Sequence, residues 1–383
     1  MDSILEDIRV LDLTHVWFGP WCTMMLADFG AEVIRVEPPW GAIDRIAEGA
    51  RFGGASYTFH HLNLNKKSLT INLKTSEGIE IFEKLVKESD VVVQNFRPGT
   101  MDRLGLSYER LKMLNSKIIY AALSGFGQYG PYSSRGSYAP IAESMSGHTR
   151  LTGDGVDPEG PPILMAESYG DLGPGTLAAM SIIAAIRYRD KTGKGQMIDV
   201  AQLDCMVALN TAVTGYLLSG MKPWEMQVKY PGMSGIRDLM KTRDNKWIMI
   251  RIGTPASLDR LREYFGTEEL KKEMIKEMVS KMTRDEALAF FIENRIPVGP
   301  VYHVNEVIKD PHLISREMFI EVNHLDAGKI KVVNFPIKFS QTPVRIRGAA
   351  PLLGQHNREI LIRLGYNEED IIKLKQSGVI AYA

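Results

Sequence analysis

Cysteine is scarce in this chain. Cys22 and Cys205 are the only two among 383 residues, too few for a disulfide framework or a cysteine metal cage. Such sparse cysteine favours a reducing compartment. The first residues lack a basic segment followed by an apolar one, and no uncharged apolar run reaches membrane-spanning length. We therefore expect a cytoplasmic protein with no membrane partner.

Net charge is also missing, because 46 basic residues balance 46 acidic ones. This balance argues against nucleic acid as the main partner, although it leaves room for a local basic patch that binds an anionic ligand. The hydrophobic and charged fractions, 44% and 24%, are those of an ordinary globular protein. A chain of 383 residues exceeds the usual size of one hydrophobic core, so we expect two domains.

Several catalytic motifs are absent or incomplete. No G-x-S-x-G elbow is present, which disfavours a serine hydrolase of the α/β-hydrolase type, and residues 193–196 lack the spacing of a P-loop. The histidines are scattered, and the adjacent pair His60-His61 would point in different directions in a strand, so no metal site is predicted.

Residues 125–130 match G-x-G-x-x-G and follow a predicted strand, but the next residues do not favour a helix start. We therefore expect neither nicotinamide nor flavin as cofactor. A dinucleotide oxidoreductase stays an alternative that a failed nicotinamide titration would dismiss.

Short apolar runs alternate with helical patterns in the first half of the chain. The expected strands cover 8–13, 32–37, 91–94 and 118–123, and the expected helices cover 19–30, 79–87 and 108–114. This alternation indicates an α/β fold with a mainly parallel sheet and helices on its faces. Ligands of such sheets bind beyond the carboxyl ends of the strands, which here are 14–18, 95–99 and 124–127.

The later part of the chain has a different pattern. Residues 222–235 are rich in Pro, Gly and Met and predict a crossing into a smaller α+β domain. A strand at 247–252 and amphipathic helices at 258–265, 270–282 and 285–293 follow, and a last helix at 359–364 returns to the first domain. We place the large domain at 1–224 and 321–383 and the small domain at 225–320.

Four basic side chains lie in or beside the predicted loops: Lys74, Arg97, Arg103 and Arg135. Such groups bind phosphates through charge-assisted hydrogen bonds. Each one alone is more often a solvated surface charge. Their common location at the ligand-binding edge favours an anionic ligand.

The segment 166–175 sets one carboxylate, Asp171, before a long apolar run. The run predicts a buried helix that starts near Gly173 and ends before Lys191. The helix dipole and free N–H groups at such a start keep a carboxylate ionised and stabilise a developing oxyanion. Two interpretations are open from these residues: Asp171 is a catalytic nucleophile, or it is an ordinary N-cap.

Taken together, many ordered blocks resemble the class III CoA-transferase family, which includes formyl-CoA transferase, the carnitine CoA-transferases and the 2-methylacyl-CoA racemases. The resemblance spans nearly the whole chain. The matching blocks are 10–14, 19–20, 26–39, 65–68, 95–99, 125–127, 130–132, 166–175, 191–196, 297–302 and 310–312. The resemblance implies a Rossmann-like large domain, a small domain, and two subunits threaded together as an interlocked homodimer; a heteromer stays open.

The resemblance makes Asp171 the nucleophile and implies coenzyme A or its acyl esters as substrate. The implied CoA contacts are His15, Val16, Trp17, Phe18, Ile71, Lys74, Asn95, Phe96, Arg103 and Arg135, to which we add Arg97 and Tyr138. Formyl-CoA transferase uses an arginine just after the second strand, where this chain has Pro38. The nucleotide end of CoA is therefore expected to be held differently.

The racemases of this family add a histidine, whose place falls near residues 137–139, where none stands. CoA transfer is therefore preferred, with a racemase and a catalytically silent subunit of a heteromeric transferase as alternatives. The implied reaction passes through an aspartyl-acyl anhydride and an aspartyl-CoA thioester. We expect backbone N–H groups near Gly173 and Gly175 to stabilise the oxyanions, and residues 231–235 to close over the site.

Large side chains in and near the first loop indicate the size of the acyl group. Trp17 and Phe18, with Met24, Met25 and Trp40 close by in sequence, favour a larger, aromatic or branched acyl group. Core packing by these side chains is the alternative. The resemblance suggests succinyl-CoA as donor, with an arylsuccinate-like acid as one candidate acceptor.

Overall fold

The computed structural model describes residues 3–46, 51–221 and 236–381. Contacts divide the chain into two compact units, Met1–Gly220 with Met318–Ala383, and Met221–Glu317. The boundaries predicted from the sequence fell after residues 224 and 320. Each unit is described by itself below.

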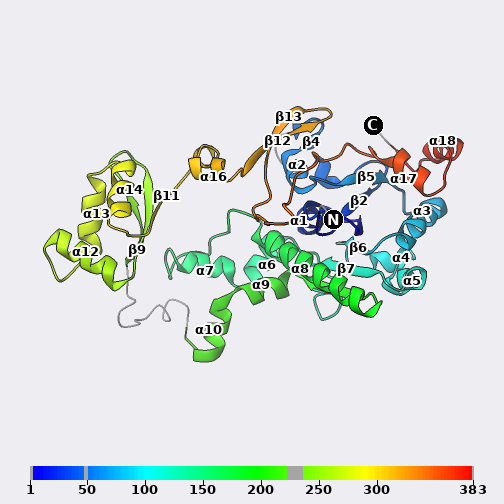
Figure 1. Ribbon diagram of the computed structural model, residues 1–383. Coiled ribbons are helices and arrows are strands. Elements are labelled where there is room, and N and C mark those ends of the chain that lie inside the picture. The colour runs from blue at the N-terminus through cyan, green and yellow to red at the C-terminus, as the bar shows by residue number, and fades with distance from the viewer. Residues whose placement is uncertain (1–2, 47–50, 222–235, 382–383) are drawn as a thin grey trace. The chain divides into compact units, whose positions relative to one another are not determined.

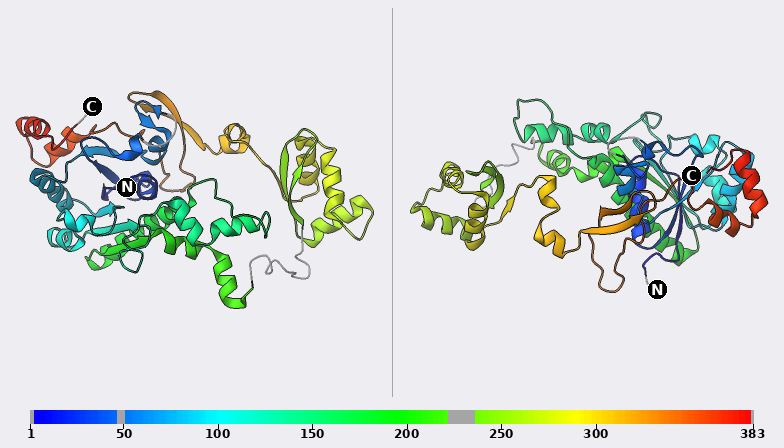
Figure 2. Two further views of the ribbon diagram at one scale, coloured as in Figure 1. Left: turned by 180° about the vertical axis from the view of Figure 1, so that it is seen from behind. Right: turned by 90° about the horizontal axis from the view of Figure 1, so that it is seen from above.

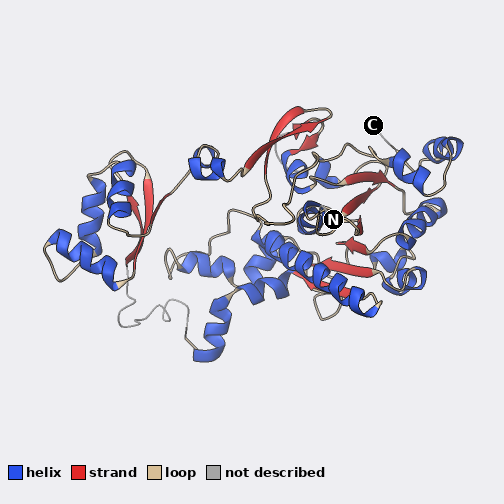
Figure 3. Cartoon of the chain, viewed as in Figure 1, coloured by secondary structure: helices blue, strands red, loops and turns tan. Residues whose placement is uncertain are grey.

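The first unit is built on a six-stranded parallel sheet (Figures 1 and 3). Its strands are β1 (Arg9–Asp12), β2 (Glu32–Glu37), β5 (Lys67–Thr70), β6 (Val91–Gln94), β7 (Ile119–Ser124) and β8 (Met197–Ala201). They lie in the order β5-β2-β1-β6-β7-β8, and every neighbouring pair is parallel. Counted along the chain this is the 3-2-1-4-5-6 order of a Rossmann-like sheet, in which the order reverses between β1 and β6.

Apolar side chains alternate between the two faces of this sheet, as a period of two requires. Val10 packs with α1 (Phe18–Asp28) and α8 (Tyr169–Thr192) on one face. Leu11 packs on the other face with the helices α3 (Ser76–Lys87), α5 (Tyr108–Leu114), α17 (Asn357–Arg363) and α18 (Glu368–Gln376). The C-terminal helices therefore share a core with the first strand, and Figure 2 shows them, in red, beside α3. The predicted α/β fold with a mainly parallel sheet is confirmed.

A close approach of backbones fixes α8 against α1. A Cβ atom on Gly175 would lie 2.8 Å from the carbonyl oxygen of Phe18 and 2.9 Å from Trp21 Cδ1, so only glycine fits there. The indole Nε1 of Trp21 donates a hydrogen bond to Thr176 Oγ1 at 3.0 Å. The beginning of α8 is therefore held beside the loop that follows β1.

The long helix α8 departs from the prediction in two ways. It begins at Tyr169, a turn before Gly173, so Pro174 lies inside the helix. It is also buried on one face only: Ile182 is inaccessible, whereas Met180 is 60% exposed. The apolar run predicted burial all round because it contains no polar face.

The remaining elements of the first unit are short. They are η1 (Ile43–Arg45), β3 (Arg51–Phe52), β4 (Ala55–Ser56), α2 (Tyr57–Leu62), α4 (Thr100–Arg103), α6 (Ala139–Met145), α7 (His148–Asp154), α9 (Gln202–Leu209), α10 (Thr211–Ser219), β12 (Phe319–His324) and β13 (Gly328–Val333). The last two strands form an antiparallel hairpin.

The second unit is a small α+β body. Its antiparallel sheet β11-β10-β9 consists of β9 (Ile236–Lys241), β10 (Trp247–Ile252) and β11 (Val298–Pro300). The helices are α12 (Pro255–Phe265), α13 (Lys272–Ser280), α14 (Arg284–Glu293), α15 (Val304–Val307) and α16 (Pro311–Ser315). Alternate residues Ile248, Ile250 and Ile252 of β10 form its core with Val279 and Phe291. Within the described ranges, the chain has no helix with the length and apolar character needed to cross a membrane.

Candidate active site

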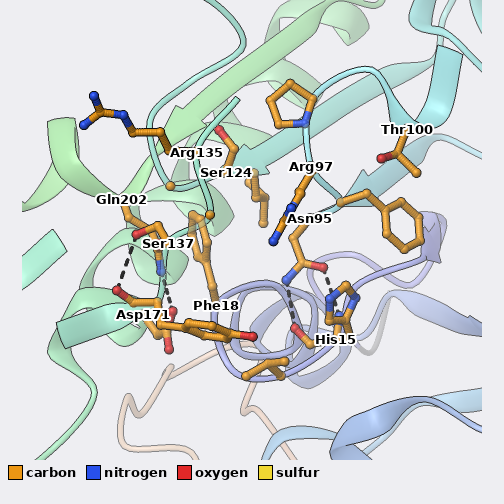
Figure 4. Close-up of a pocket in the computed structure, with 17 residues that line it drawn as sticks. His15, Phe18, Asn95, Arg97, Thr100, Ser124, Arg135, Ser137, Asp171 and Gln202 are labelled. Carbon is orange, nitrogen blue, oxygen red and sulfur yellow. Dashed lines mark hydrogen bonds between the residues drawn. The ribbon is translucent and has the colours of Figure 1, made fainter. Parts of the chain in front are cut away.

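A pocket of about 340 Å³ lies at the carboxyl edge of the parallel sheet, where the strand order reverses. Its walls come from the loops after β1, β6 and β7 and from the first turns of α8 and α9 (Figure 4). The pocket brings together nine residues predicted from the sequence: His15, Val16, Phe18, Asn95, Phe96, Arg97, Arg135, Tyr138 and Asp171. This is the location where open α/β sheets bind their ligands.

Among the described residues that line this pocket, Asp171 is the only carboxylate. It is the third residue of α8, and its side chain is nearly buried, at 7% exposure. The positive end of the helix dipole favours the ionised carboxylate here. Ser168, rather than Asp171, occupies the N-cap position, so the N-cap interpretation of Asp171 is wrong.

The backbone N–H groups at the start of α8 already have acceptors. The N–H of Gly170 donates to Oε1 of Glu143, a buried carboxylate on α6, at 2.8 Å. The N–H groups of Asp171 and Leu172 both donate to the carbonyl of Ser168. Gly173 and Gly175 lie inside the helix, where N–H groups bond to carbonyls four residues earlier. The prediction that Gly173 and Gly175 donate to an oxyanion is therefore wrong.

Gln202 is the polar neighbour of the candidate nucleophile, and the sequence analysis missed it. Its Nε2 donates a hydrogen bond to Asp171 Oδ1 at 2.5 Å, and its side chain is 4% exposed. It is the first residue of α9 and directly follows β8, whose last residue Ala201 pairs with Ser124 of β7. The strand-end rule would have found Gln202 if residues 197–201 had been predicted as a strand.

The first loop is clamped to the loop after β6. The side chain of Asn95 accepts a hydrogen bond from His15 N at 3.0 Å and donates one to His15 O at 2.8 Å. The rings of His15 and Phe96 lie 5.7 Å apart. Burial lowers the pKa of His15, so its imidazole is neutral at pH 7. Val16 has a φ of +69°, a conformation that costs a β-branched residue energy and that the surrounding contacts must hold.

The two arginines of the pocket differ in orientation. Figure 4 shows Arg97 pointing into the space between Asp171 and His15, whereas the guanidinium of Arg135 turns away from the centre. The Cζ atom of Arg135 lies 3.8 Å from the centroid of the Tyr132 ring, within cation–π range. No salt bridge joins either arginine to an acid in the described part of the chain. Arg97 is therefore the cation best placed for an anionic ligand.

Four predicted contact residues do not line the pocket: Trp17, Ile71, Lys74 and Arg103. Trp17 is the N-cap of α1, next to two lining residues, and Arg103 donates from Nη2 to Oγ1 of the lining residue Thr100 at 2.9 Å. Ile71 is 1% exposed and its side chain packs in the core. CoA contacts at these four positions stay predictions.

The side chains expected to shape the acyl site do not all line the pocket. Phe18 lines the pocket, but Met24 and Met25 are buried on α1, where Met25 packs in the core. Trp40 is 68% exposed and lines a different pocket. Met24, Met25 and Trp40 therefore lie close to Phe18 in sequence but do not line this pocket, so they give the expected large acyl group no support. The proposed closing loop, 231–235, lies outside the described residues.

A buried charge network supports the pocket from behind β1. The ammonium of Lys66 donates to Asp12 Oδ2 at 3.0 Å, and both side chains are inaccessible. Burial acts to raise the pKa of Asp12, but Lys66 and Arg35 outweigh it and the pKa is lowered. Asp12 Oδ1 accepts from both N and Oγ1 of Thr14, at 2.9 and 2.5 Å. The network thereby holds Thr14, the residue before His15 in the loop after β1.

The glycines after β7 serve close packing. A Cβ atom on Gly125 would lie 2.2 Å from Ser137 Cβ, so glycine is required where the two pocket segments meet. The segment 125–130 is followed by turns, and α6 begins only at Ala139. A dinucleotide motif binds its pyrophosphate at the N-terminus of a helix that starts within the motif, and no helix starts within residues 125–130.

Metal ligands are also not grouped in the described residues, because no three His, Cys, Asp or Glu side chains lie together as a metal site requires. His60 and His61 lie on the helix α2, not on the strand considered for them.

Comparison with known proteins agrees with this architecture. Residues 5–357 match the family model described as CoA-transferase family III. The succinyl-CoA–D-citramalate CoA-transferase of Chloroflexus aurantiacus is 35% identical, over 98% of both chains, and the formyl-CoA:oxalate CoA-transferase of Streptomyces coelicolor is 33% identical, over 98% of this chain and 99% of the relative. The crystal structure of a CAIB/BAIF family protein from Brucella suis superposes with a TM-score of 0.83 at 30% identity, over 95% of this chain and all of that one. The chain therefore belongs to CoA-transferase family III, as its sequence resemblance indicated.

Proposed function

We propose that this protein transfers coenzyme A from an acyl-CoA donor to a carboxylic acid, with Asp171 as the covalent nucleophile. The observation that carries the proposal is the location of Asp171. It is a nearly buried carboxylate at the N-terminal turn of α8, in a pocket at the switch point of the sheet, opposite Arg97. The CoA-transferase names of the relatives support the reaction class.

The chemistry follows from a property of carboxylic acids. A carboxylate is a poor electrophile, so the activation of the donor thioester must be passed on rather than lost to water. Asp171 attacks the donor acyl carbon, which forms an aspartyl-acyl anhydride and releases CoA thiolate. The thiolate then attacks the aspartyl carbon, which releases the donor acid and leaves an aspartyl-CoA thioester. The acceptor carboxylate repeats these steps in reverse order.

Succinyl-CoA is the donor that we propose, because the Chloroflexus relative carries it in its name. For the acceptor we propose a dicarboxylic acid, and an arylsuccinate-like acid remains the candidate. Phe18, Phe96 and Tyr138 line the pocket and offer flat apolar surface to such a group. Arg97 offers the charge for a carboxylate or phosphate.

The racemase alternative needs a second proton-transfer group opposite Asp171. His15 is the single histidine among the described residues of the pocket lining, and residues 137–139 are Ser, Tyr and Ala. The ring of His15 contacts that of Phe96 at an interplanar angle of 38°, and the His15 backbone is fixed by Asn95. This arrangement favours transfer over racemisation. A catalytically silent subunit would have no use for the buried Asp171–Gln202 pair.

The quaternary structure is also a proposal: a homodimer, in which a second copy covers apolar surface that one chain leaves exposed. Helix α10 has no buried residue, and Leu217 and Leu218 are 78% and 84% exposed. Met180 on α8 is exposed as well. Sedimentation equilibrium of the wild type and of Leu217→Glu tests this proposal, since the charged side chain would weaken a dimer that buries this face.

For the compartment we propose the cytoplasm, which the scarcity of cysteine supports.

The decisive experiment is mass spectrometry of peptides after incubation with a panel of acyl-CoA esters, with hydroxylamine or borohydride trapping. We expect a donor-dependent adduct confined to Asp171, and none in Asp171→Ala. Appreciable transfer by Asp171→Ala would overturn the scheme. Asp171→Asn is a weaker test because deamidation can restore the acid. Intact, bound esters with an unmodified Asp171 would favour the racemase or the silent subunit.

A further inference from the structure

The proposed reaction places negative charge on an oxygen of Asp171 itself. When a thiolate or a carboxylate attacks the aspartyl carbon Cγ, the electrons of its carbonyl bond move onto that oxygen. Stabilising such an oxyanion takes a fixed hydrogen-bond donor within about 3 Å. The N–H groups of the first turn of α8, at Gly170, Asp171 and Leu172, are bonded to Glu143 and Ser168.

The structure offers a side-chain donor at this oxygen. Gln202 Nε2 lies 2.5 Å from Asp171 Oδ1, and both side chains are almost completely buried. Figure 4 shows the amide of Gln202 directed at the carboxylate along the same wall of the pocket. A neutral amide can only donate through this nitrogen, and it does not titrate.

Three contacts fix the donor in place. Ala201, the residue before Gln202, pairs with Ser124 in the sheet, and the N–H of Leu203 donates to the carbonyl of Gly125 at 3.1 Å. On the other side, α9 packs closely on α8, since a Cβ atom on Gly173 would lie 3.0 Å from Leu209 Cδ1. The nucleophile and its donor therefore begin two neighbouring helices that are packed together. A donor held in this way needs no reorganisation when charge develops.

We propose that Gln202 is a catalytic residue that stabilises the oxyanion formed on Asp171. The inference rests on the proposed function. Asp171 Oδ2 forms the bond to the donor acyl carbon, the C–S bond breaks, and Oδ1 becomes the aspartyl carbonyl oxygen. The thiolate sulfur then bonds to Cγ, and Oδ1 carries the negative charge while Gln202 donates to it. Collapse breaks the Cγ–Oδ2 bond and the donor acid leaves with that oxygen; no proton moves to or from Gln202.

Gln202 is expected to accelerate the attack on Cγ of Asp171 but not the attack of Asp171 on the donor thioester. Attack of Asp171 on the donor thioester builds charge on the donor's own carbonyl oxygen, which Gln202 does not contact in this arrangement. Attack on Cγ, by thiolate or by acceptor, builds charge on Oδ1. Loss of Gln202 is therefore expected to slow the steps at Cγ and to leave binding of the acyl-CoA ester largely intact.

The test uses the full-length protein with Gln202→Met, which keeps an unbranched side chain of similar size and removes the donor. Gln128→Met is the matched control, because Gln128 lies on the neighbouring loop after β7 and does not line the pocket. Acceptor is added to preformed aspartyl-CoA enzyme, and its decay is followed by quenched-flow mass spectrometry. We expect roughly a 10²–10³-fold slower decay in Gln202→Met, the usual effect of losing one oxyanion donor, and an unchanged rate in the control.

Gln202→Glu separates a donor from a space filler. It preserves the length of the side chain, but as a carboxylate it accepts only and repels Asp171, so we expect a loss of kcat at least as large as that of Gln202→Met. The KM for the donor and the melting temperature should stay close to wild type in Gln202→Met. A Gln202→Met enzyme with kcat within threefold of wild type would overturn the inference, as would a fall in ester affinity that accounts for the whole loss. A wild type that forms no aspartyl-CoA would instead overturn the proposed function.

Discussion

Lys66 and Asp12 form an ion pair beneath the first loop, and the replacement Lys66→Met leaves the aspartate buried without its partner. The Lys66 ammonium also donates to Pro20 O, Thr23 Oγ1 and Asn63 Oδ1, at 2.8 to 3.0 Å. Both charged side chains have no accessible surface. Removing one member of a fully buried pair costs about 3–5 kcal/mol, because the remaining charge keeps its desolvation penalty.

The assay is differential scanning calorimetry of wild type and variant at pH 7. A loss of this size lowers the melting temperature by roughly 5–15 °C, because each kcal/mol corresponds to roughly 2–4 °C in a domain of about 150–250 residues and to less in a larger unit such as the first one here. The matched control is Lys67→Met, the same change at the next residue, where the ion pair with Glu32 at 2.9 Å is about a quarter exposed. A partly exposed pair of this kind contributes at most about 1 kcal/mol.

A second variant separates charge from packing. Asp12→Asn combined with Lys66→Met removes both buried charges, so we expect it to recover part of the stability that Lys66→Met loses. A Lys66→Met protein that melts no lower than Lys67→Met would refute the reasoning. So would a double variant whose loss of stability equals or exceeds the sum of the losses in Asp12→Asn and Lys66→Met, because the two charges would then contribute no favourable coupling.

Three further outcomes are expected. Burial acts to raise the pKa of Glu37, but Arg35 and Arg45 lower it from 4.5 to about 2. The ionised Glu37 therefore stabilises the fold fully above about pH 4.5, and this contribution is lost as the pH falls toward 2. In acid titrations followed by circular dichroism, the free energy of unfolding of Glu37→Gln should fall by roughly 3 kcal/mol less over that window than that of the wild type. Gly125→Ala should lose kcat out of proportion to stability, because its Cβ would displace the pocket wall at Ser137; equal activity at equal melting temperature would contradict this. Arg97→Ala should raise the KM for a CoA ester roughly 10–100-fold, because a charge-assisted hydrogen bond to a phosphate is lost. The KM for a short thioester that lacks phosphates should stay unchanged. An equal rise in both KM values would mean that Arg97 binds the acyl group instead.

Local pattern was sufficient for four strands of the parallel sheet and for the loops at their carboxyl ends, but it missed β5 and β8. The strand and helix alternation was visible because apolar runs such as 91–93 have no polar interruption. The strand-end rule then located the loops that carry His15, Asn95 and Arg97, and these do line the pocket. The 3-2-1-4-5-6 order and the switch point between β1 and β6 were not visible, since pairing between distant strands leaves no local pattern.

The error at the nucleophile had a single cause. The sequence placed the start of α8 near Gly173 because the prediction was based on the apolar run that follows Gly175. The helix begins at Tyr169 because the carboxylate of Glu143, 27 residues away, accepts the N–H of Gly170 and so satisfies a donor that a helix start leaves unpaired. That contact moved Asp171 from before the helix into its first turn, and it placed Gly173 and Gly175 beyond the free N–H groups.

The same shift explains why a side chain is needed at the nucleophile. A helix that began near Gly173 would have offered its own N–H groups to an oxyanion beside Asp171. Because α8 begins earlier, we expect the oxyanion on Asp171 to take a donor from another element, and Gln202 of α9 donates to Oδ1 of Asp171. The position of the helix start and the presence of an amide at residue 202 are therefore linked. Gln202→Met should slow transfer, whereas Glu143→Gln, which retains an acceptor for Gly170, should leave the helix start and the rate of transfer nearly unchanged.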